Sequence, residues 1–99
     1  MDSVVAKVIP KLLKIGGLTV VVEQSRMLAS SRDKFGEYSF MEQKITIDQF
    51  LSDDKKAATL LHEILEALNG YFELDISHAK LTVLGFALYQ VLSDNELQF

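Results

Sequence analysis

One of the chain's two histidines, His62, is followed directly by Glu63 and one helical turn later by Glu66. In a helix, residues four apart lie about 40° apart around the axis, so the side chains of His62 and Glu66 can reach a common point. Imidazole and carboxylate are both zinc ligands, so this pair could supply two ligands of a metal ion. Glu63 lies about 100° further round, where its carboxylate could stand beside a metal-bound water without coordinating the ion.

His78, the other histidine, is the candidate third ligand. If residues 69–77 join two antiparallel helices, the second helix starts near the end of the first, which can bring His78 within ligand range of Glu66. Gly85, two turns further on, has no side chain and would let the first helix approach closely. Two histidines and one carboxylate suit catalytic zinc, with the fourth position open for water.

Other interpretations of these residues stay open. Glu73 and Asp75 lie in the same connection and could replace His78 as a ligand, or they could be ordinary solvated acids of a loop. His62 and Glu66 could form a hydrogen-bonded pair at the margin of the core that binds no metal. The pattern predicts a zinc site formed by His62, Glu66 and His78, with these alternatives beside it.

The composition excludes several classes of function. The 99 residues include no cysteine, which excludes disulfides, thiolate ligands and a cysteine nucleophile. The ten basic residues are scattered and the net charge is -4, so we expect no nucleic-acid partner. Apolar runs are far shorter than the ~18 residues of a membrane span, and residues 1–3 lack the basic start of a signal peptide. The sequence predicts one domain, residues 1–99, in the cytoplasm.

The first half of the chain has the pattern of strands and turns. Gly16-Gly17 joins two β-favouring runs, residues 11–15 and 18–23, as expected for a tight hairpin. Residues 2–9 could form a helical turn or a loose strand, and residues 24–32 are equally ambiguous between a helical turn and a loop.

A second hairpin is predicted further along. Residues 35–41 and 44–48 are β-favouring runs on either side of Glu42-Gln43. Together the two hairpins predict an antiparallel sheet of three or four strands. The expected core positions of the second hairpin are Tyr38, Phe40, Ile45 and Ile47.

The second half of the chain predicts two packed antiparallel helices and hence an α+β fold. Ser52 is a suitable N-cap for the first helix, which Asn69-Gly70 would end. Its apolar stripe consists of Ala57, Ala58, Leu61, Ile64, Leu65 and Leu68. Ser77 would cap a second helix over residues 78–92, with the helical hairpin packed on the sheet. The expected core side of this helix consists of Leu81, Leu84, Leu88, Val91 and Leu92.

Most of the chain, from about Lys11, resembles the small phage and prophage proteins related to the ImmA/IrrE-type zinc metallopeptidases. The similarity is carried by residues 36–38 and 44–47, and above all by TLLHEILEAL at 59–68 and LYQVLSDN at 88–95. The resemblance implies a minimal zincin, with a small sheet, a helix bearing the ligand motif and a second ligand-bearing helix.

The chain departs from the HExxH motif of the peptidase-like relatives. Glu66 stands where the second histidine is expected, and His78 stands near the expected place of the acidic ligand. The exchange keeps two imidazoles and one carboxylate, which favours retained metal binding. The resemblance also implies metal-assisted hydrolysis with Glu63 as general base, and residues 44–47 as an edge strand for an extended peptide.

Two functions are consistent with this sequence. The first is a zinc-dependent, metallopeptidase-like phage or prophage protein, with Zn²⁺ as cofactor, Glu63 as catalytic residue and a peptide or protein substrate in the host cytoplasm. Tyr71 and Tyr89 would be the candidates for stabilising an oxyanion. The second is a non-catalytic module on the same scaffold that binds a host or phage protein, because a chain of 99 residues leaves little room for a substrate cleft.

Overall fold

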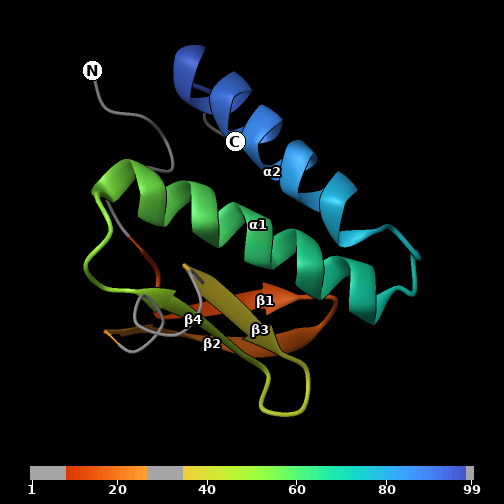
Figure 1. Ribbon diagram of the computed structural model, residues 1–99. Coiled ribbons are helices and arrows are strands. Elements are labelled where there is room, and N and C mark those ends of the chain that lie inside the picture. The colour runs from red at the N-terminus through yellow and green to blue at the C-terminus, as the bar shows by residue number, and fades with distance from the viewer. Residues whose placement is uncertain (1–8, 27–34, 98–99) are drawn as a thin grey trace.

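The chain folds into a sheet followed by two helices, which confirms the predicted α+β class. The computed structural model describes residues 9–26 and 35–97, so the predictions for residues 2–8 and 27–32 lie outside it. The elements are stacked in the order sheet, first helix, second helix (Figure 1). In chain order they are β1 (Leu12–Ile15), β2 (Leu18–Ser25), β3 (Gly36–Ser39), β4 (Lys44–Asp48), α1 (Asp53–Tyr71) and α2 (His78–Asp94).

Both predicted hairpins form. β1 pairs with β2 in antiparallel register around Gly16-Gly17, where both glycines have positive φ as a tight turn of this kind requires. β3 pairs with β4 in the same antiparallel manner, with Tyr38 opposite Ile45.

The sheet is mixed, so the prediction of an entirely antiparallel sheet is wrong in one pairing. The strand order is β1-β2-β4-β3, and β2 runs parallel to β4, with Val22 opposite Ile45. The more apolar strand of the second hairpin takes the central place, because β4 carries Ile45 and Ile47, which are both fully buried. β3 is left at the edge of the sheet.

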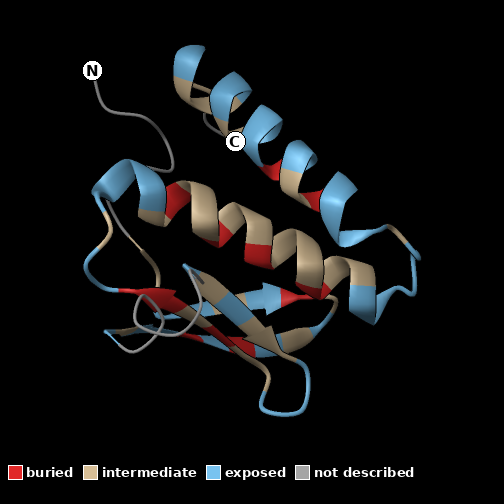
Figure 2. Cartoon of the chain, viewed as in Figure 1, coloured by how far each residue is buried: buried red, intermediate tan, exposed pale blue. Residues whose placement is uncertain are grey.

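The core lies between the sheet and α1 (Figure 2). Ile45 and Ile47 confirm two of the predicted core positions, and Tyr38 is half-buried against the same cluster. Phe40 is 57% exposed, so its prediction as a core residue is wrong; it lies in the turn beyond β3, where strand alternation no longer sets the side-chain direction. The buried members of the cluster are Ile15, Val20, Val22, Ile45, Ile47, Leu60 and Ala67.

α1 begins as predicted and ends slightly later. The Ser52 side chain accepts a hydrogen bond from the Lys55 N–H at 3.3 Å, which confirms it as the N-cap. The helix continues through Asn69-Gly70 to Tyr71. Of the predicted apolar stripe, Ala57 is buried and the other five residues are half-buried, because the helix is covered on two sides. Its buried residues are Ala57, Leu60, Glu63 and Ala67.

α2 begins at His78 as predicted, and the Ser77 side chain caps it by accepting from the Lys80 N–H at 3.2 Å. Among the described elements, however, α2 contacts only α1, so it does not pack on the sheet (Figure 1). Leu81 is buried, and Leu92 is half-buried. The prediction fails for three other positions, which stay exposed because α1 is the only described element that covers α2: Leu84, Leu88 and Val91.

Gly36 sets how closely the edge strand approaches α1. A Cβ added to Gly36 would lie 2.5 Å from Thr59 Cγ2 and 3.3 Å from Glu63 Cγ. β3 therefore lies directly against the part of α1 that carries the His62-Glu63 motif.

We expect Gly36→Ala to lower the free energy of unfolding by about 1–3 kcal/mol, because the added methyl overpacks this contact. Gly70→Ala is the matched control: it lies within α1 and a Cβ there meets nothing within 4 Å, so stability should stay the same or rise by up to about 1 kcal/mol. Urea denaturation followed by circular dichroism measures both. Equal stability of the two variants would contradict the close approach.

Candidate metal centre

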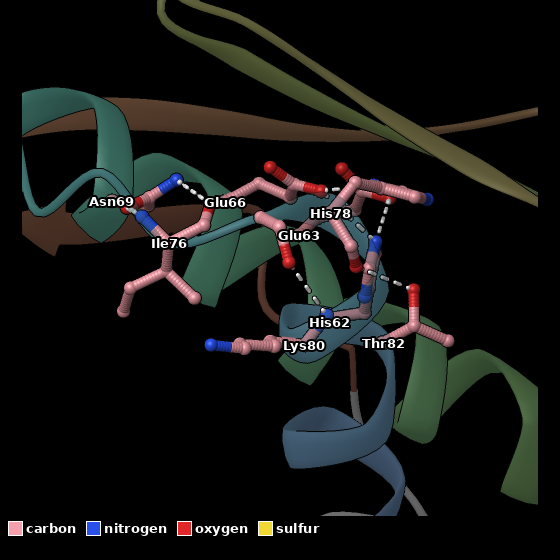
Figure 3. Close-up of polar contacts among 9 residues, drawn as sticks. His62, Glu63, Glu66, Asn69, Ile76, His78, Lys80 and Thr82 are labelled. Carbon is pink, nitrogen blue, oxygen red and sulfur yellow. Dashed lines mark hydrogen bonds and ion pairs between the residues drawn. The ribbon is translucent and has the colours of Figure 1, made fainter.

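The three residues predicted as ligands lie together at one end of the helical pair. His62 and Glu66 come from α1, and His78 is the first residue of α2. The Nε2 atom of His62 lies 3.3 Å from Oε2 of Glu66, and Nδ1 of His78 lies 2.6 Å from the same oxygen (Figure 3). One ligand atom from each residue can be chosen so that all three lie within 4.8 Å of one another. This group could hold a metal ion.

Asn69 ties the residues just before His78 to α1. Its side-chain Nδ2 donates to the carbonyl of Ile76, and its Oδ1 accepts from the N–H of Ile76, both at 2.9 Å (Figure 3). These two bonds tie the end of the connection back to α1, three residues beyond Glu66. The sequence predicts Asn69 only as a helix stop, because its bonds to Ile76 depend on how the connection folds back.

Gly85 brings the two helices close at His62, as predicted. Gly85 is buried, and a Cβ added to it would lie 3.4 Å from Cα and 3.5 Å from Cβ of His62. The rings of His62 and His78 pack edge to face, with centroids 5.1 Å apart. The close approach of the two backbones is what lets a residue of α2 share a site with residues of α1.

Two of the distances within the group can be compared with those around a tetrahedral ion. A tetrahedral ion with bonds of about 2.0–2.1 Å separates its ligand atoms by roughly 3.3 Å. The distance between His62 and Glu66 matches this value, whereas the 2.6 Å contact between His78 and Glu66 is a hydrogen bond that would have to lengthen. The His78 side chain is 76% exposed and can move, while the other two side chains are held between the helices.

Glu63 lies beside the group and is not part of it. It is buried where α1 packs against β3, and its Oε2 lies 4.0 Å from Nε2 of His62. A carboxylate at this distance is close to the ligand set but points from a different face of the helix.

The alternative ligands do not join the group. Glu73 and Asp75 are exposed and both have positive φ, and the cluster found among residues 9–26 and 35–97 contains neither of them. The hydroxyl of Tyr89 donates to Asp54 at 2.7 Å near the start of α1, and Tyr71 packs against the β1–β2 turn. Neither tyrosine lines the cleft at the site, so the structure does not place them as oxyanion donors.

A cleft of about 940 Å³ opens over the three candidate ligands. It lies between β3 and the first half of α2, so the expectation that the chain has little room for a cleft is wrong. Glu63 and Tyr38 also line it, and the pKa of Tyr38 is raised by burial, which keeps its phenol protonated. Three phenylalanines with exposed rings stand in its walls: Phe35, Phe40 and Phe86.

The strand beside the cleft is β3. Residues 44–47, predicted as the edge strand, belong to β4, which is hydrogen-bonded on both sides to β2 and β3. Gly36, Glu37 and Tyr38 of β3 line the cleft. An apolar cleft with a few polar groups gathered in it is typical of ligand sites.

Comparison with known proteins identifies no relative of this chain. A scan against protein-family models and searches of curated proteins and of solved structures found no match. Within the described residues, no helix combines the length and the apolar character needed to cross a bilayer.

Proposed function

We propose that this chain binds zinc through His62, Glu66 and His78 and hydrolyses a peptide bond in the cleft above them. The observation that carries the proposal is the meeting of two imidazoles and one carboxylate, from two helices, inside an apolar cleft. The likeness of the motif to the ImmA/IrrE-type metallopeptidases of phages and prophages supports the hydrolytic part of the proposal.

The chain supplies a proton acceptor for this reaction. Bound zinc would polarise the substrate carbonyl and lower the pKa of its water to about 7. Glu63 would take the proton of that water and pass it to the leaving amine. Its burial against β3 fixes the carboxylate near His62, so that little rearrangement is needed before the proton is transferred.

The proposed substrate is an extended peptide. β3 is the edge strand next to the cleft, and an edge strand can pair its free backbone groups with a bound chain. Phe35, Phe40 and Phe86 would contact apolar side chains of that peptide. Glu37, exposed on β3, would favour basic residues over acidic ones at neighbouring positions.

Zinc content tests the ligand set. We expect about one zinc per chain after purification without chelator, and Glu66→Ala should lose it because the central ligand is gone. Glu73→Ala removes the same charge from the exposed connection and should retain zinc. Plasma emission spectroscopy measures the ratio. A wild-type chain that holds no zinc after reconstitution would leave the non-catalytic interaction module as the better account.

Glu63→Gln separates metal binding from catalysis. The amide keeps the shape of the side chain but cannot accept the proton, so hydrolysis of a fluorogenic peptide library should fall by about 100-fold or more while zinc stays bound. Glu73→Gln serves as the control with the same chemical change outside the cleft. Loss of zinc from Glu63→Gln would identify Glu63 as a ligand and refute its role as base.

Asn69→Ala tests how His78 is positioned. Without the two bonds to Ile76 the start of α2 is held less firmly, so zinc affinity should fall about tenfold by competition with a chromogenic chelator. Asn95→Ala removes a similar side-chain bond of 2.9 Å, to the Val91 carbonyl, at the opposite end of α2. Equal zinc affinities in the two variants would show that the clamp does not position the ligand.

A further inference from the structure

The outward face of α2 is apolar along most of its length. Residues 81–93 contain no charged side chain. Val83 is 68% exposed, and Leu84 and Val91 are also exposed. The side of α2 turned away from α1 is coloured as exposed along most of its length (Figure 2). Gln90 is the polar residue on this face, and its side chain donates to Asp94 at 3.0 Å. An exposed surface formed mainly by apolar side chains is typical of a site where another molecule binds.

Charges mark both ends of this face. Lys80 and Asp94 are exposed, and each lies seven residues from Ala87, which is exposed midway between them. Seven residues are close to two helical turns, so the three side chains point to the same side of the helix. Val83 and Val91 lie four residues to either side of Ala87 on that face. The pattern is symmetric in position and opposite in charge.

We infer that a second copy of this chain covers the face, with the two α2 helices packed antiparallel about a two-fold axis at Ala87. In this register Lys80 meets Asp94 of the partner subunit, and Val83 meets Val91 of the partner subunit. Ala87 lies at the crossing point, where its small side chain lets the two helices come close. The contact is isologous, since the same patch serves on both subunits.

The charges select the antiparallel orientation. In a parallel pair, each Lys80 would face the same lysine of the other copy, and each Asp94 would face the same aspartate, so both ends would repel. In the antiparallel pair both ends attract. The end charges therefore favour a second copy over an unrelated apolar helix, which would have to carry the same spacing of opposite charges.

The proposed interface leaves the cleft open. His78 and Gly85 are both about 180–200° round the helix from Ala87, so the face that meets α1 and the face that meets the partner are opposite sides of α2. Dimer formation is therefore a property of the chain that does not rest on the proposed metal site, and each can fail without the other.

The test is the oligomeric state of the full chain. α2 is about 25 Å long, and a contact made by one helix from each subunit is small, so we expect a dissociation constant on the order of 10 µM. Sedimentation equilibrium from about 1 to about 300 µM should show a monomer that converts to a dimer across this range. A monomer at every concentration, or an assembly larger than a dimer, would overturn the inference.

Charge exchange tests the register. Lys80→Glu and Asp94→Lys should each weaken the dimer about tenfold or more, because two attractive pairs become repulsive, and the double variant should restore it. Lys14→Glu makes the same charge change on β1 and should leave the dimer unchanged. Ala87→Glu should give a monomer that keeps its circular dichroism spectrum. A double variant as weak as the single ones, or a dimer that survives Ala87→Glu, would overturn the proposed interface.

Discussion

The close approach of α2 to α1 at Gly85 and His62 is the constraint on which the candidate site depends. A Cβ at Gly85 would already lie in van der Waals contact with His62, 3.4 Å from its Cα, so a side chain larger than a methyl group would push the two helices apart. This contact brings His78 beside Glu66, and the clamp between Asn69 and Ile76 fixes it from the other side. The site is therefore produced by helix packing as much as by the motif on α1.

α1 packs against the sheet on one side and against α2 on the other, and the residue types on its faces reflect these two contacts. Leu60 and Ala67 face the sheet, whereas His62 faces α2, and Glu63 is buried at the boundary beside β3. A carboxylate so poorly exposed is costly unless it has local partners or a function. Glu63 has His62 beside it, 4.0 Å from its carboxylate, and it also stands in the wall of the cleft.

The sequence predicted what depends on local pattern. The turn at Gly16-Gly17, the caps at Ser52 and Ser77, and the meeting of the three candidate ligands all follow from residue types at short spacing, or from one short connection between helices.

What the sequence could not predict depends on comparisons between distant elements. No local sequence feature indicates that β4 rather than β3 pairs with β2, because that choice depends on which strand buries more apolar surface. The exposure of Leu84 and Val91 could not be predicted for a related reason. An apolar helix face can be covered either by its own chain or by another molecule, and the sequence pattern is the same in both cases.

The two hydrogen bonds that join Asn69 to Ile76 have a consequence for how this architecture can vary. They fix both ends of the connection, while Gly70 and the five residues after it, up to Asp75, are all exposed. A longer or shorter loop between these two residues would therefore leave the helix start that carries the histidine in place. Loop length and site geometry are uncoupled, so the loop is the part of the molecule where new binding contacts can evolve at the least risk to the fold.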